Sequence, residues 1–151
     1  MYNTLQFLHV TAAIVWLGSG IGFSVLLALM SSKGDRGALL SVGQYLDTLG
    51  NRLFGPAAMA TLLFGVLAVL ARDELSFADL WITIGFAGVA VSLALVAVRA
   101  PTAKRIGPAV QEHGPASAEV DALLAKARTI NIIDIVLLLI VVWAMVVKPG
   151  A

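Results

Sequence analysis

Four long apolar stretches dominate this chain and restrict what it can fold into. Within them, the only His, Lys, Arg, Asp or Glu side chains are His9 and Asp134. A helix rises about 1.5 Å per residue, so about 20 apolar residues cross a hydrocarbon core of roughly 30 Å. We therefore predict an all-α fold, an antiparallel four-helix transmembrane bundle that forms one domain. Its spans are expected at about 5–30, 53–71, 80–98 and 129–147.

The composition agrees with a membrane protein and excludes several other classes. Hydrophobic residues make up 60% of the chain and charged residues 13%, well outside the usual balance of soluble domains. Because there are zero cysteines, disulfides and thiolate-bound metals are excluded. The sequence has no phosphate-binding loop, no basic-aromatic surface for nucleic acid and no catalytic set for hydrolysis. Without internal repeats or interrupted helices, it also lacks the usual architecture of a transporter.

The basic residues indicate how the spans are oriented. All Lys and Arg residues except Arg72 and Lys148 lie in the first and third connections. The positive-inside rule places such connections in the cytoplasm, so both termini are expected outside. Tyr2, Trp81 and Trp143 then lie at the outer interface, where aromatic side chains are common.

Helical periodicity extends into both basic connections. In the first, apolar residues recur at helical spacing from Leu39 to Leu53, which predicts a short helix. This helix suits either a position in the cytoplasmic interface or a helical lead-in to the second span. In the third, the same spacing from Val120 to Ala127 predicts that the fourth helix begins before the membrane. All five prolines fall at or beyond the ends of the predicted spans, where we expect helix boundaries.

Small residues form stripes on three of the predicted helices. On the first, Gly18 and Gly22 form a motif that allows close approach of another helix, on the face opposite His9. The other stripes are Thr61, Gly65 and Ala68 in the second span and Gly85, Gly88 and Ser92 in the third. We interpret these stripes as ordinary packing surfaces.

Five residues share one face of the fourth helix: Asp134, Leu138, Val141, Met145 and Lys148. An ionised Asp is costly in lipid, so this face is expected to point into the protein and Trp143 toward lipid. We favour an ion pair for Asp134, the candidate partners being Arg52, Arg99 and Arg128, with help from Asn131. The alternative is a carboxylate that takes up a proton or anchors a substrate.

His9 is the only imidazole within a predicted span, about four residues from its outer edge. Ionisable groups inside a membrane are functional candidates, and neutral imidazole is a common ligand of haem iron. Met145 faces inward at nearly the same depth, and a His–Met pair holds six-coordinate haem in some proteins. We therefore predict His9 and Met145 as metal ligands of haem b. The alternatives are a His9 hydrogen bonded to a neighbouring helix and a Met145 that fills a gap in the core.

Four further residues complete the predicted haem site. On the His9 face, Gly20 leaves a shallow surface beside Trp16, as a flat macrocycle requires. Arg72 and Lys148, at the outer ends of their helices, are expected near the propionates. His113, in a solvated connection, is assigned no role.

Three segments of the chain resemble an uncharacterised bacterial family of small four-span integral membrane proteins, the DUF2269-like family. They are His9-Val-Thr-Ala-Ala-Ile-Val-Trp16-Leu-Gly18, Arg52-Leu-Phe-Gly-Pro56 and Met145-Val-Val-Lys-Pro149-Gly150. The resemblance covers nearly the whole chain and implies a multi-pass protein of the bacterial inner membrane. It implies architecture more than activity.

The stretch from His9 to Trp16 also resembles the first helix of the HemJ-type protoporphyrinogen oxidases and, more loosely, the CopD-like membrane proteins. In HemJ-type proteins the corresponding His is associated with b-type haem, which implies His9 as an axial ligand. This chain departs from the HemJ pattern because it has no Arg-rich continuation after Trp16 and no Lys inside the third span. These departures argue against porphyrinogen oxidation.

From these observations we expect a haem b protein of the membrane that transfers electrons or oxidises a lipophilic substrate. The alternative is a non-catalytic small subunit that packs against a larger membrane complex through faces such as Gly18 and Gly22 or Gly85 and Gly88. The expected partners are the lipid bilayer and either a second copy of the chain or a larger membrane complex, and no nucleic acid.

Overall fold

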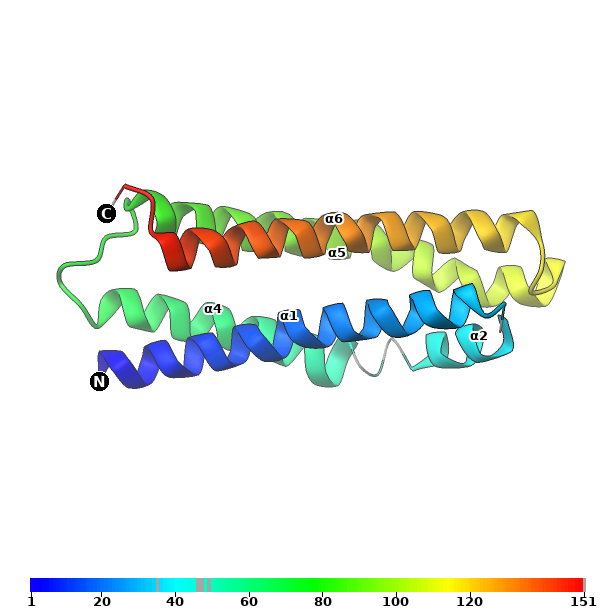
Figure 1. Cartoon of the computed structure of the whole chain (residues 1–151), viewed down its shortest axis with the longest axis horizontal. Coiled ribbons are helices and arrows are strands. Elements are labelled where there is room, and N and C mark those ends of the chain that lie inside the picture. Colours follow the sequence, from blue (N-terminus) through cyan, green and yellow to red (C-terminus); the bar gives the residue numbers. More distant parts are fainter. Residues whose placement is uncertain (35, 46–47, 49, 151) are drawn as a thin grey trace. The chain divides into compact units, whose positions relative to one another are not determined.

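The computed structural model describes residues 1–34, 36–45, 48 and 50–150, and these residues are almost all helical (Figure 1). In order, the elements are α1 (Tyr2–Ser32), α2 (Arg36–Gln44), the π-helical turn η1 (Gly50–Phe54), α4 (Gly55–Leu70), α5 (Leu80–His113) and α6 (Ala118–Val147). Over these ranges there is no strand. The predicted all-α class is confirmed.

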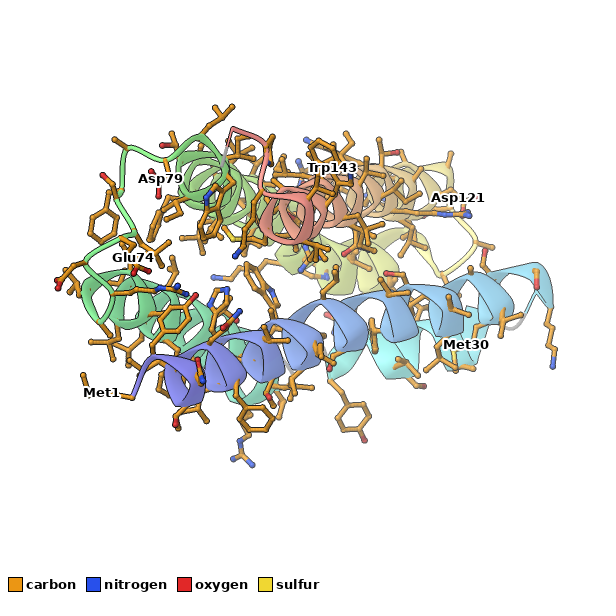
Figure 2. All side chains as sticks on the ribbon, turned by 60° about the vertical axis from the view of Figure 1, so that its left-hand side comes forward. Met1, Met30, Glu74, Asp79, Asp121 and Trp143 are labelled. Atoms are coloured by element: carbon orange, nitrogen blue, oxygen red, sulfur yellow. The ribbon has the colours of Figure 1, made fainter. Side chains whose placement is uncertain are left out.

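Among the described residues, four helices are long and apolar enough to cross a membrane: α1, the segment Arg52–Leu70, α5 and α6. Their surfaces remain apolar, since Phe7, Ile14 and Trp143 have exposed fractions of 67%, 65% and 54%. Figure 2 shows Trp143 on the surface of α6. Water-soluble monomers rarely expose so much apolar surface, whereas lipid solvates it. The described residues therefore contain four candidate membrane helices, as predicted, and these helices are consistent with the predicted bundle.

The chain divides into two compact units, Met1–Asp79 and Leu80–Ala151. In the first unit, α1 and α4 pack against each other in antiparallel directions (Figure 1). The cation of Arg72 lies over the ring of Tyr2, and His9 bonds to Thr61, so increasing residue numbers on α1 meet decreasing numbers on α4.

In the second unit, α5 and α6 form a long antiparallel hairpin. Arg105 pairs with Glu119 near the turn, and Arg99 bonds to Asn131 further along. The core between the two helices contains Ile82, Val89, Val120, Leu138 and Ala144, all of which are buried.

The helix α5 extends well beyond the predicted end of the third span at residue 98. It continues through Pro101 and Pro108 to His113, so the expectation that these two prolines mark helix boundaries was wrong. A proline removes one backbone donor, and beyond the hydrocarbon core water can bond to the carbonyl group that this leaves free. By contrast, Pro56 lies in the first turn of α4, as predicted, a position where proline is common.

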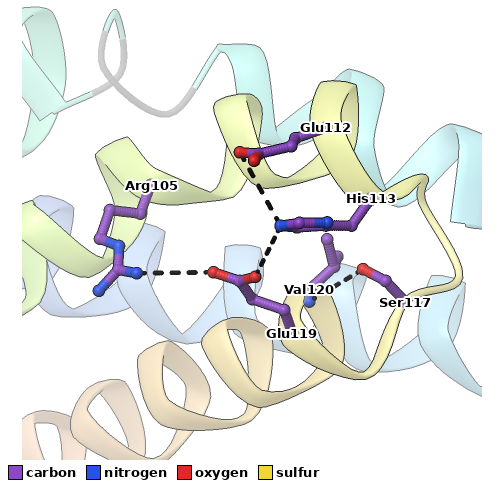
Figure 3. A network of polar contacts seen from close by, with 6 residues as sticks. All are labelled: Arg105, Glu112, His113, Ser117, Glu119 and Val120. Atoms are coloured by element: carbon purple, nitrogen blue, oxygen red, sulfur yellow. Dashed lines mark hydrogen bonds and ion pairs between the residues drawn. The ribbon is translucent and has the colours of Figure 1, made fainter.

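The helix α6 begins at Ala118, as the periodicity after residue 115 predicted. Ser117 caps it by accepting a hydrogen bond from the backbone N–H of Val120, and Glu119 adds negative charge in the first turn. Glu119 also accepts from Arg105 and lies 3.1 Å from Nε2 of His113, as Figure 3 shows. These exposed contacts join the ends of α5 and α6.

The first connection contains the predicted short helix, α2, and the turn η1 leads directly into α4. A helical lead-in to the second span is therefore present, and the position of α2 in the cytoplasmic interface stays a prediction. Two residues of the apolar stripe that predicted them, Leu46 and Leu49, lie outside the described residues.

Candidate functional site

The imidazole of His9 is fixed against α4. Its Nδ1 lies 2.8 Å from the backbone carbonyl oxygen of Thr61. A carbonyl oxygen can only accept a hydrogen bond, so Nδ1 carries the hydrogen and donates it. In the neutral ring, Nε2 then carries a free lone pair. His9 is therefore held in the tautomer that can bind a metal ion through Nε2.

This geometry is compatible with both interpretations of His9. In one interpretation, His9 is a structural residue that is hydrogen bonded to a neighbouring helix. The same bond is also how metal-binding histidines are usually oriented, because their second ring nitrogen commonly donates to a backbone carbonyl or a carboxylate. The bond therefore gives Nδ1 a hydrogen-bond partner and leaves Nε2 available to a ligand.

Gly65 makes room for the His9 ring one turn after Thr61 on α4. A Cβ atom at position 65 would lie 3.0 Å from Nδ1 and 3.1 Å from Cε1 of the imidazole. The hydroxyl group of Thr61 donates to the carbonyl of Ala57, 2.8 Å away, and does not compete for His9. The Thr61 and Gly65 stripe, which the sequence indicated only as a packing surface, is thus where the ring of His9 packs. In the sequence, the signal for this contact was the helical spacing of Thr61 and Gly65 in one span together with a histidine inside another span.

The substitution Gly65→Ala should shift the His9 ring by a few tenths of an ångström and weaken the bond to Thr61. One such bond contributes about 1 kcal/mol, so we expect a modest fall in the free energy of unfolding. The direct measurement is the NMR signal of the His9 Nδ1–H in protein labelled with ¹⁵N-histidine. Gly18→Ala is the matched control, because nothing lies within 4 Å of a Cβ atom there. An identical His9 signal in Gly65→Ala would contradict the proposed contact.

On the face of α1 that carries His9, the position of Gly20 is open, and the role of Gly20 and Trp16 in binding haem stays a prediction. Nothing within the described residues lies within 4 Å of a Cβ atom at Gly20, and Trp16 is partly exposed. The surface of α1 at Gly20 is therefore open in the described part of the chain.

Both cations predicted near the outer ends of the helices lie over aromatic rings. The Cζ of Arg72 is 4.9 Å from the ring centroid of Tyr2, and the Nζ of Lys148 is 5.1 Å from that of Trp81. Arg72 also donates from Nε to Glu74 at 2.6 Å. This hydrogen bond raises the pKa of the Arg72 guanidinium above its ordinary value, so the group stays charged. A carboxylate from a ligand would compete with Glu74 for Arg72.

Met145 fills a notch in α5. A Cβ atom at Gly85 would overlap its Cε, and one at Gly88 would overlap Cγ2 of Val141. The predicted inward face of α6 therefore points toward α5. The packing of Met145 matches the gap-filling alternative, and its role as a ligand stays a prediction. His9 and Met145 belong to different units, each described by itself.

The packing at Gly85 and Gly88 contradicts the interpretation of this face as a surface for a partner protein. Both were considered as surfaces for a partner, but α6 of the same chain already fills them. At Gly18 and Gly22, in contrast, nothing in the described part of the chain lies within 4 Å of a Cβ atom.

Asp134 meets Ser92 in the interface between α5 and α6. Arg99, one of the predicted partners, acts on the carboxylate electrostatically, while its Nη1 donates to Oδ1 of Asn131 at 2.8 Å. Arg99 and Asn131 are thus bonded to each other, and the expected ion pair of Asp134 with an arginine stays a prediction. Ser92 is fully buried, yet over the described ranges neither its Oγ nor Oδ1 of Asp134 has a hydrogen-bond partner.

A family model described as "Predicted integral membrane protein (DUF2269)" matches residues 3–149. Neither a curated protein nor a solved structure matches the chain. The resemblances to HemJ-type and CopD-like proteins stay predictions.

Proposed function

The chain belongs to the DUF2269 family of predicted integral membrane proteins, and we propose that it binds b-type haem through His9. In this proposal it transfers electrons in the membrane or oxidises a lipophilic substrate. The observation that supports the proposal most is the hydrogen bond from Nδ1 of His9 to Thr61, which leaves the lone pair on Nε2. An imidazole in this tautomer, inside an apolar span, is suited to an iron ligand.

The residues around His9 fit a flat, hydrophobic cofactor. The carbonyl of Thr61 orients the ring, and Gly65 allows the ring to lie close to α4. Gly20 and Trp16 offer an open apolar surface for one side of a macrocycle. When bound, haem supplies one-electron oxidation and reduction.

Three other residues have roles that belong to the proposal. Met145 is the proposed second axial ligand, in which case its side chain would leave the notch at Gly85. Arg72 and Lys148 would neutralise the propionates, with Arg72 exchanging Glu74 for a propionate. Each of these steps requires a side chain to change its partner, whereas His9 could bind iron without such a change.

A visible spectrum of the purified wild-type protein tests this function. Expression with ample haem should yield a coloured protein with a Soret band and a reversible change on reduction by dithionite. A colourless preparation of folded protein under these conditions would rule out the haem proposal.

One observation favours a second function, that of a non-catalytic subunit. The Gly18 and Gly22 face of α1 is open, and small residues allow a partner helix to approach closely. In this case native purification should give a colourless protein together with a constant large membrane partner. Gly22→Leu should release that partner, whereas Gly107→Leu, at another open glycine outside α1, should retain it.

A further inference from the structure

Two buried oxygen atoms lie in the α5–α6 hairpin, one on each helix. Ser92 has an exposed fraction of 0%, and Oδ1 of Asp134 is buried as well. The hydroxyl lies close enough to the carboxyl group to act on it. Among the described residues, however, neither atom completes a hydrogen bond. Polar atoms buried without partners are costly, and more so where the surrounding solvent is lipid.

The nature of the missing partner follows from the charges around it. From α5, the charged group that faces Asp134 is Arg99, which is bonded to Asn131 one turn earlier on α6. The positive charge of this guanidinium acts on Asp134 and would repel a metal cation there. Hard metal ions also need about six oxygen ligands, many more than Ser92 and Asp134 supply. A proton needs only one oxygen atom to bind to and one acceptor for its hydrogen bond.

We propose that Asp134 and Ser92 form a proton-binding site within the α5–α6 hairpin. Asp134 takes up one proton to become a neutral carboxylic acid and releases it to become a carboxylate. A hydroxyl group can both donate and accept. Ser92 therefore donates to the carboxylate in the ionised state and accepts from the acid in the neutral state.

Arg99 and Asn131 make this exchange compatible with a membrane environment. In the ionised state the guanidinium of Arg99 balances the charge of Asp134. In the neutral state the guanidinium keeps its hydrogen bond to Oδ1 of Asn131, 2.8 Å away, and is not left without a partner. The site therefore needs no movement of α5 against α6. It is independent of haem and of His9.

Infrared spectroscopy of the full-length protein in lipid vesicles tests the proposal. A pH titration should reveal a carbonyl stretching band of a carboxylic acid that appears and disappears with pH. Asp134→Asn should remove this band, while Asp121→Asn, on the exposed first turn of α6, should leave it. Ser92→Ala should keep the band but shift its frequency, because the hydrogen bond is lost.

Several outcomes would overturn the proposal. One is the absence of any titrating band that Asp134→Asn removes, as expected for a carboxylate that stays ionised beside Arg99. Another is a band that Asp134→Asn removes but Ser92→Ala leaves at the same frequency, which would exclude Ser92 as the partner. If Asp134→Asn does not fold, Ser92→Ala alone tests the proposal. A shifted band would support Ser92 as the partner, and an unchanged band would exclude it.

Discussion

His9→Ala should abolish the Soret band of the purified protein, and His113→Ala should leave it intact. The two substitutions remove the chain's 2 histidines one at a time. His9 lies in α1 with its Nδ1 bonded to Thr61, whereas His113 lies at the exposed end of α5 beside Glu119. Removing an axial ligand eliminates the iron–nitrogen bond, so we expect loss of nearly all bound haem. The measurement is the ratio of Soret to protein absorbance after identical expression with added haem.

A cavity variant separates the loss of a ligand from a general loss of structure. In His9→Gly the ring is absent, and added imidazole should enter the space and restore the band. A misfolded protein would not recover in this way. If His9→Ala retains the wild-type spectrum, or if His113→Ala loses it, His9 is not the ligand.

The four spans could be predicted from the sequence because lipid imposes a simple length requirement on apolar stretches. The ends of the helices were harder to predict. In α5, residues 99–113 are polar enough to leave the membrane and contain Pro101 and Pro108, yet the helix continues. Its continuation depends on packing against the early part of α6, where Val120 is buried and Arg105 meets Glu119. Such tertiary contacts override the local preference of proline.

The candidate site was predictable in part for a similar reason. The inward faces of α1 and α6 follow from helical periodicity, so His9, Asp134 and Met145 could be placed on them. The partners of these residues depend on the register between two helices. The periodicity of a single helix does not determine this register. Thus Gly65 was interpreted as a packing residue, although it lies directly against the imidazole. Ser92 and Asp134 likewise meet only because α5 and α6 pair in one particular register.

That register predicts unequal effects for two neighbouring glycines of α5. A new methyl group at Gly85 would meet the end of Met145, a flexible unbranched side chain that can turn aside. At Gly88 it would meet Cγ2 of Val141, whose branched side chain has one strongly preferred rotamer in a helix. Gly88→Ala should therefore force the two helices apart, whereas Gly85→Ala should be tolerated.

Measured against Gly18→Ala, we expect Gly88→Ala to lower the free energy of unfolding by about 1–3 kcal/mol, the usual effect of overpacking. Gly18→Ala is the matched reference because it gains the same helix propensity of about 1 kcal/mol in open space. Unfolding in mixed micelles, titrated with sodium dodecyl sulfate, gives all three values. The double variant Gly88→Ala with Val141→Ala should recover most of the loss, because the smaller side chain frees the notch. Equal stability of Gly88→Ala and Gly18→Ala would mean that α5 and α6 do not pair in this register. The contact between Ser92 and Asp134 would then be lost with it.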